Sequence, residues 1–220
     1  MAYFCAVTVT LLAIAAALAV GDWVAVYLRL FRIEYALKPA TLAVLVAAAG
    51  TAHLGEVKPW IVAALGLGLL GDIGLMLSSG RTDSPFLSGL GAFLGGHICY
   101  AVAFLQLGLR GLPLLAGTLV SAGIAGLALP AVLRGAARAG GRGFAAIVAT
   151  YAAALAAMAV LGVGTGIVAT AIGAVAFLCS DTLIAYERFV RRVRHGSVLV
   201  MITYHLAQFL ILAGVLHAAS

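Results

Sequence analysis

The chain has 220 residues, of which 65% are hydrophobic and only 9% are charged, and its formal net charge is +6. Its mean hydropathy is +1.19. A water-soluble domain carries roughly 25% charged residues and uses them to cover its surface. This composition therefore excludes a soluble globular protein. It predicts an all-α polytopic membrane protein, because a helix satisfies its own backbone hydrogen bonds inside lipid.

Apolar runs separated by charged residues, Gly and Pro predict a bundle of eight transmembrane helices that forms a single domain over residues 1–220. Each run approaches the length of about 20 residues that a helix needs to cross the hydrocarbon core. The loops between the runs are too short for a soluble domain. The predicted spans are 3–21, 37–54, 59–78, 86–107, 112–133, 144–161, 166–187 and 197–218.

Basic residues are divided unevenly between the loops of the two sides. Eleven of the 13 lie in or beside the first, third, fifth and seventh loops, whereas the other loops hold only Lys58 and Arg110. Since Lys and Arg accumulate on the cytoplasmic side, the odd-numbered loops are predicted to be cytoplasmic and both termini outside. The basic charge thus indicates topology and contact with anionic membrane lipids, with no nucleic acid as a partner. The eleven residues are Arg29, Arg32, Lys38, Arg81, Arg134, Arg138, Arg142, Arg188, Arg191, Arg192 and Arg194.

Two acidic residues, Asp72 and Asp181, lie inside predicted spans. An ionisable group at that depth costs at least about 2.5 to 3.5 kcal/mol and marks a functional site unless a structural partner explains it. Asp72 lies nine residues before Arg81 and Asp181 lies seven before Arg188, so both carboxylates are expected roughly 10 to 14 Å from the cytoplasmic surface. The other five acids are predicted to be near surfaces and solvated: Asp22, Glu34, Glu56, Asp83 and Glu187.

Further polar residues share this depth, at roughly 11 to 21 Å by the same helical rise. His97 and Tyr100 are three residues apart and Tyr204 and Gln208 are four apart, so each pair lies on one helix face. Tyr151 lies in the sixth predicted span. The pattern predicts a polar pocket between helices that opens toward the cytoplasmic leaflet and has the two carboxylates at its base.

The two halves of the chain show similar spacings of polar residues. Asp72 and His97 are 25 residues apart, and Asp181 and His205 are 24 apart. This predicts a possible parallel repeat of four helices, 1–110 and 111–220. Lys38 has no lysine counterpart in the second half.

Several short segments carry a resemblance to a known family. They are Lys38-Pro39, Gly71-Asp72 with Leu75-Met76, Phe93 with His97 and Tyr100, Ser180-Asp181 with Ala185 and Arg188-Phe189, and Tyr204 with Gln208. Their order and spacing resemble the lysoplasmalogenase family, the YhhN-like membrane proteins. His205 stands where an aromatic or apolar residue is expected in such proteins.

The resemblance implies hydrolysis of the vinyl ether bond of a lysoplasmalogen, which releases a fatty aldehyde and glycerophosphoethanolamine or glycerophosphocholine. The partner would be a lysophospholipid, and no cofactor or metal is implied. Vinyl ethers hydrolyse by protonation of the alkene carbon and capture of the resulting oxocarbenium ion by water. That chemistry calls for a general acid and a charge-stabilising carboxylate, roles for which Asp72 and Asp181 are the candidates. Which of them is the acid stays open.

The remaining site residues are expected to bind substrate, water or the carboxylates. Lys38, near the cytoplasmic headgroup level, is the first candidate for contact with the phosphate, and Arg188 is the second. The others are His97, Tyr100, Tyr151, Ser180, Tyr204 and Gln208.

Two other functions use the same residues. His97, His205, Asp72 and Asp181 could hold the zinc ion of a membrane lipid hydrolase of the ceramidase type, although no HExxH spacing supports it. The two aspartates could instead form the proton relay of a small transporter. The Ala-rich, short-looped chain is typical of a bacterial protein, and hence of an inner membrane.

Overall fold

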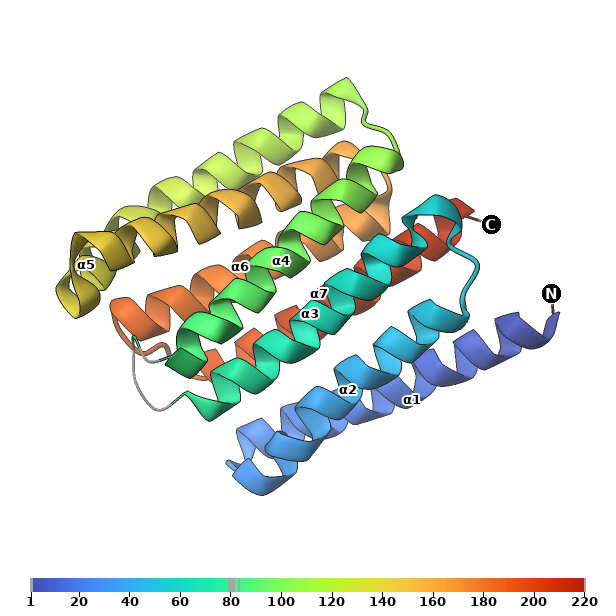
Figure 1. The fold of residues 1–220 in the computed structure, drawn as a ribbon, viewed down its shortest axis with the longest axis horizontal. Coiled ribbons are helices and arrows are strands. Elements are labelled where there is room, and N and C mark those ends of the chain that lie inside the picture. The colour runs from blue at the N-terminus through green and yellow to red at the C-terminus, as the bar shows by residue number, and fades with distance from the viewer. Residues whose placement is uncertain (1, 79–81, 83, 220) are drawn as a thin grey trace.

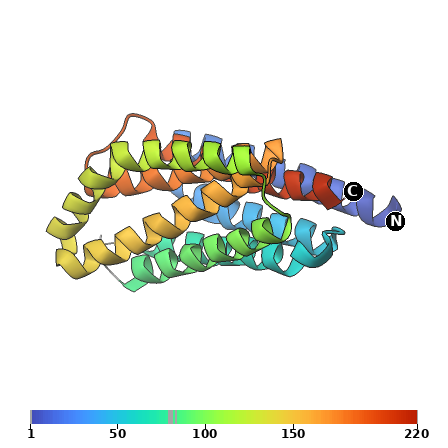
Figure 2. The same cartoon turned by 90° about the horizontal axis from the view of Figure 1, so that it is seen from above.

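The computed structural model describes residues 2–78, 82 and 84–219, and this part of the chain is all-α. Its helices run along the long axis of an elongated bundle (Figures 1 and 2). A short 3-10 turn, η1 (Gly55–Val57), precedes the third helix. The helices are α1 (Ala2–Tyr27), α2 (Phe31–Thr51), α3 (Lys58–Leu77), α4 (Ser84–Gln106), α5 (Gly111–Gly164), α6 (Val168–Phe189) and α7 (Gly196–Ala219).

Helix α5 has 54 residues and contains a sharp reversal. A straight helix of that length would measure about 80 Å, far more than the roughly 30 Å hydrocarbon core of a bilayer. The reversal occurs at Gly140 and at Gly141, whose φ of 77° is readily adopted only by glycine. From this turn the two limbs, 111–139 and 142–164, both lead back toward the other end of the bundle (Figure 1). They contain the predicted spans 112–133 and 144–161. The described chain thus has seven helices, one of them doubled back, where the sequence predicts eight separate ones.

All seven helices are long and apolar enough to cross a membrane. Their outward faces carry large apolar side chains, among them Leu127, Leu112 and Val168, which are 88%, 79% and 72% exposed. An apolar surface of this kind would cause aggregation in water but is stable in contact with lipid. The chain is therefore an integral membrane protein.

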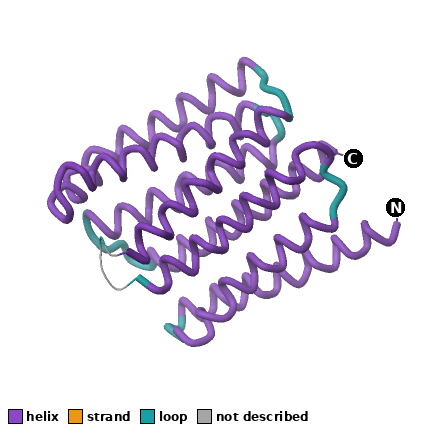
Figure 3. The backbone as a smooth tube through the Cα atoms, in the orientation of Figure 1, coloured by secondary structure: helices purple, strands orange, loops and turns teal. Residues whose placement is uncertain are grey.

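The connections gather at the two ends of the bundle (Figures 1 and 3). Both termini lie at one end, with the connections around residues 52–57, 107–110 and 165–167. The turn after α1, the end of α3, the start of α4, the turn inside α5 and the segment after α6 lie at the other end. Most of the basic residues that the structure describes lie in or near these connections, whereas Lys58 and Arg110 lie at the opposite end. Arg81 lies outside the described residues, as does the acidic Asp83. The assignment of the more basic end to the cytoplasm stays a prediction.

The first helical hairpin differs most from the sequence prediction. α1 continues to Tyr27 and α2 begins at Phe31, whereas the predicted spans end at 21 and begin at 37. Asp22 is therefore inside α1 and 0% exposed, so its placement at a solvated surface is wrong. Lys38 is inside α2 and 7% exposed, and thus deeper than predicted. Both errors have one cause: these charges face other helices, and a charge on an inward face looks like a loop residue in the sequence.

Close approaches of small residues bring the site helices together. A Cβ on Gly74 of α3 would lie 2.7 Å from the Cα of Gly89 on α4, and one on Gly173 of α6 would lie 2.9 Å from the carbonyl oxygen of Ala207 on α7. Only glycine permits such backbone contact between membrane helices. These contacts hold α3 against α4 and α6 against α7.

Candidate active site

Asp72 lies at the meeting point of α2, α3 and α7 and is buried. The Lys38 ammonium of α2 is 3.0 Å from Asp72 Oδ1, and the Tyr204 hydroxyl of α7 donates to Asp72 Oδ2 at 3.0 Å. Both carboxylate oxygens are thus occupied. An opposite charge and hydrogen bonds compensate a buried carboxylate, and Lys38 and Tyr204 supply both to Asp72.

Asp181 lies on the other side of the bundle, between α4, α5 and α6. The Tyr151 hydroxyl donates to Asp181 Oδ2. His97 Nε2 is 3.2 Å from the same oxygen and 3.0 Å from the Tyr151 hydroxyl. Since the single hydroxyl proton of Tyr151 is donated to Asp181, the contact between Tyr151 and His97 requires a proton on His97 Nε2. The three side chains therefore form a closed triangle that leaves Asp181 Oδ1 outside it.

Aromatic rings join the two aspartate groups. Phe177 lies 4.9 Å from His97 and 5.5 Å from Tyr204, measured between ring centroids. The Tyr100 hydroxyl, next to this ring, donates to the side-chain oxygen of Gln208. The two groups are thus linked through a layer of aromatic side chains.

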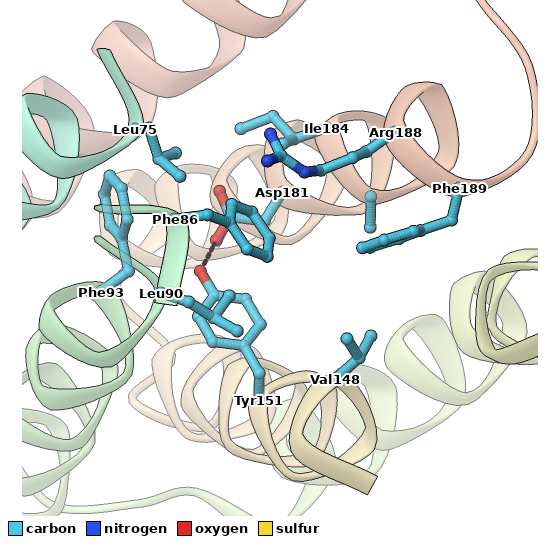
Figure 4. Close-up of a pocket in the computed structure, with 11 residues that line it drawn as sticks. Leu75, Phe86, Leu90, Phe93, Val148, Tyr151, Asp181, Ile184, Arg188 and Phe189 are labelled. Carbon is cyan, nitrogen blue, oxygen red and sulfur yellow. Dashed lines mark hydrogen bonds between the residues drawn. The ribbon is translucent and has the colours of Figure 1, made fainter. Parts of the chain in front are cut away.

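A cavity of about 50 Å³ lies beside Asp181 and is lined by side chains from α3, α4, α5 and α6. Figure 4 shows its mainly apolar wall, with Asp181 and Tyr151 joined by their hydrogen bond and Arg188 above them. Tyr151, Asp181 and Arg188 are its only polar side chains among the described residues. The cavity combines an apolar wall, one carboxylate and one guanidinium.

Arg188 is fixed in place at this cavity. Its guanidinium carbon lies 3.7 Å from the centre of the Phe86 ring, and Nη2 donates to the Ser78 hydroxyl at 3.1 Å. A guanidinium that stacks on an aromatic face presents its N–H groups as a planar fork, a geometry that suits phosphate. Arg188 is therefore a preformed candidate for an anion contact.

The structure brings the predicted site residues into neighbouring groups. Lys38 and Tyr204 bind Asp72, His97 and Tyr151 bind Asp181, and Tyr100 binds Gln208. Arg188 joins the cavity of Asp181. Ser180 differs, because its hydroxyl donates to the backbone oxygen of Val200 at 3.2 Å and so links α6 to α7.

The sequence prediction missed a polar group on α1. Besides the buried Asp22, the Trp23 indole donates to His205 Nδ1 at 3.0 Å. A signal for it exists in the sequence, because the apolar residues Val24 to Tyr27 after Asp22 allow the helix to continue. Such a continuation places Asp22 within the bundle.

The zinc alternative finds no ligand set in the described part of the chain, where no group of three or more His, Cys, Asp or Glu side chains is arranged to hold a metal ion. His205 accepts a hydrogen bond from Trp23 on α1, Asp72 binds Lys38, and only His97 and Asp181 contact each other. The four proposed ligands therefore do not converge on one point.

Known proteins resemble this chain over most of its length. The YhhN family matches residues 33–215. Proteins named lysoplasmalogenase from Mycobacterium bovis and Mycobacterium tuberculosis are each 34% identical to the chain over 189 residues, which is 80% of this chain and 67% of theirs. No solved structure matches the chain. On the extent of the family match, the chain belongs to the YhhN family.

Proposed function

We propose that this protein is a lysoplasmalogenase, which hydrolyses the vinyl ether bond of a lysoplasmalogen to a fatty aldehyde and glycerophosphoethanolamine or glycerophosphocholine. The observation that carries the proposal is the apolar cavity with Asp181 at its wall and Arg188 beside it. An amphiphile with one phosphate fits this combination. The relatives named lysoplasmalogenase support the same reaction.

The substrate phosphate is assigned to Arg188. Lys38, the first candidate from the sequence, is buried and paired with Asp72 at 3.0 Å, so its charge is already compensated. Arg188 lies two helical turns from Asp181 on α6, which places the two residues roughly 10 Å apart along the helix. The long arginine side chain can reach a phosphate while the vinyl ether end of the same molecule lies at Asp181.

The cavity holds the reacting end of the lipid and not its tail. A volume of about 50 Å³ is far below the roughly 300 to 1,000 Å³ of sites that enclose a whole ligand. The hydrocarbon tail therefore extends into the bilayer along the apolar outer faces of the helices. This arrangement lets the enzyme take its substrate from the membrane.

Asp181 is assigned the proton transfers. Lys38 and Tyr204 occupy both oxygens of Asp72, whereas Asp181 is held through Oδ2 alone and lines the cavity. In the first step Asp181 Oδ1 gives its proton to the alkene carbon, whose π electrons form the new C–H bond, and the ether oxygen stabilises the oxocarbenium ion. The negative charges on Asp181 and Asp72 stabilise this cation.

In the second step water adds to the oxocarbenium carbon and its proton returns to Asp181, which regenerates the acid. The hemiacetal then collapses: its hydroxyl proton is lost, the bond to the glycerol oxygen breaks, and this oxygen takes up a proton. The products are the aldehyde and the free glycerol hydroxyl. Tyr151 and His97 hold Asp181 Oδ2, so that Oδ1 faces the substrate throughout.

The test uses the purified protein and three lysophospholipids with the same headgroup, joined to the chain by a vinyl ether, an alkyl ether or an ester. Mass spectrometry of the products should detect fatty aldehyde from the vinyl ether alone. In water enriched in ¹⁸O, the glycerol product should carry no label, because the bond on the alkenyl side breaks. Absence of aldehyde, or label in the glycerol product, would overturn the proposal.

A further inference from the structure

Asp22 is a buried carboxylate that the proposed reaction does not use. It is 0% exposed, and neither of its oxygens has a hydrogen-bond partner among the described residues. Its charge interacts with Lys38 and with Asp72. Leaving a buried polar group unpaired costs about 1 to 3 kcal/mol, and more for a charged one. Ordered water normally satisfies such groups.

Two donors on α7 are unmatched in the same way. His205 accepts the Trp23 indole proton at Nδ1, so a neutral ring carries its own proton on Nε2, which has no described partner. Gln208, one turn further on, gives its oxygen to the Tyr100 hydroxyl and leaves Nε2 without one. Unmatched acceptors on α1 thus accompany unmatched donors on α7, where Trp23 joins the two helices.

Lys38, the cation whose charge acts on Asp22, also has hydrogen-bond donors that no described residue uses. An ammonium group has three N–H donors, and Asp72 takes one of those of Lys38. The charge of Lys38 also acts on His205 and Asp22. Lys38 therefore interacts with both buried carboxylates and has hydrogen-bond donors beyond the one that Asp72 takes.

We propose that Asp22, His205 and Lys38 form a binding site for ordered water. A water molecule can donate to a carboxylate oxygen of Asp22 and accept from the Nε2 proton of His205 or the ammonium of Lys38. It thereby supplies the two to four partners that a buried water needs. The site joins residues of α1, α2 and α7, and all of α1 precedes the family match, which begins at residue 33.

This site has a use if the proposed function holds. Each vinyl ether hydrolysis consumes one water, while the cavity at Asp181 has an apolar wall. The Asp22 site supplies that water from the opposite, polar side, past Lys38 and Asp72. Asp22 is in this sense a positioning residue, because it acts through the water and through Lys38 and does not touch the lipid.

The site is tested first without any assay of activity. A high-resolution structure of the wild-type protein should show ordered water within about 3.2 Å of Asp22 and of His205 Nε2. Asp22→Leu should remove this water, whereas Asp22→Asn, which keeps the size and polarity, should retain it. A direct hydrogen bond from Asp22 to Lys38 or to a backbone carbonyl in place of water would overturn the proposal. This result does not depend on whether the protein is a lysoplasmalogenase.

Kinetics then test the use of the water. We expect Asp22→Leu to lower kcat about tenfold with KM unchanged, and Asp22→Asn to recover at least half of the wild-type kcat. Glu34→Gln is the matched control, because Glu34 is a partly exposed acid whose charge also reaches Asp22. It should match the wild type. Wild-type kcat in Asp22→Leu, or equal losses in the two Asp22 variants, would refute the supply of water.

Discussion

The two buried aspartates lie at similar predicted depths but in opposite settings. Asp72 has both oxygens occupied, one by the ammonium of Lys38 and the other by Tyr204. Asp181 is held through Oδ2 alone, by Tyr151 and His97, and lines a cavity. The two aspartates can therefore have different tasks. Asp72, which Lys38 compensates, provides a fixed charge, and Asp181, which is held through one oxygen, is available for proton transfer.

The largest expected effect is at Asp181. Replacing it with Asn keeps the shape but removes the proposed proton donor, so kcat should fall by at least about 10³-fold, within the range of general acid catalysis. KM should stay near the wild-type value, because the phosphate contact is retained. Aldehyde release from monodisperse protein is the measurement. Full activity of Asp181→Asn would show that Asp181 is not the proton donor and would make Asp72 the candidate for that role.

The ion pair between Lys38 and Asp72 should contribute to the free energy of unfolding as well as to activity. Lys38→Met leaves the Asp72 carboxylate buried without its cation, which should lower the free energy of unfolding by about 3 to 5 kcal/mol. Adding Asp72→Asn should restore most of this loss, because both partners are then neutral. Thermal unfolding in detergent measures it.

Neither Asp72→Asn nor the double variant should release aldehyde. If the double variant is as unstable as Lys38→Met, the ion pair is not what stabilises this region. If Asp72→Asn is fully active, Asp72 has no part in catalysis.

The two tyrosines offer a matched pair of substitutions. Tyr151→Phe and Tyr204→Phe each remove one hydroxyl that donates to an aspartate. A hydrogen bond to a charged group contributes about 1.5 to 3 kcal/mol. We expect Tyr151→Phe to lower kcat about 10- to 100-fold and Tyr204→Phe only a few-fold, because Lys38 still holds Asp72. Equal losses in steady-state kinetics would contradict the different tasks of the two aspartates.

At Arg188 the expected effect is about tenfold and concerns substrate binding. Arg188→Gln should raise KM about tenfold, equivalent to 1.4 kcal/mol, with kcat unchanged. An alkenylglycerol that lacks the phosphate should be cleaved equally by the wild type and the variant. A KM effect that persists with this lipid would show that Arg188 supports the cavity and does not bind the phosphate.

Much of the architecture was predictable because the bilayer imposes it. The helices α3, α4, α6 and α7 begin and end within a few residues of the predicted spans. The reversal at Gly140 and Gly141 falls in the predicted loop between 133 and 144. The same physics selects the candidate site residues, since a polar group inside an apolar span needs a partner or a function.

The partners of these residues could not be predicted. His97 and Asp181 belong to α4 and α6, and Lys38 and Asp72 to α2 and α3, and nothing in the linear order pairs them. The sequence predicts Asp22 and Lys38 near surfaces, because it shows that a residue is charged but not which way it faces. The possible repeat of four helices stays a prediction.

The sequence by itself determined that this chain is a membrane protein and approximately where its helices begin and end. It also identified the few polar residues inside apolar spans that need a partner or a function. These follow from hydropathy and helical rise, which are local properties. The tertiary structure decided which aspartate is paired with a lysine, which one faces a cavity, and that a third aspartate is buried against α7 and α2. Those facts depend on how helices distant in the chain rotate and pack against one another, and charge compensation inside lipid is settled only at those contacts.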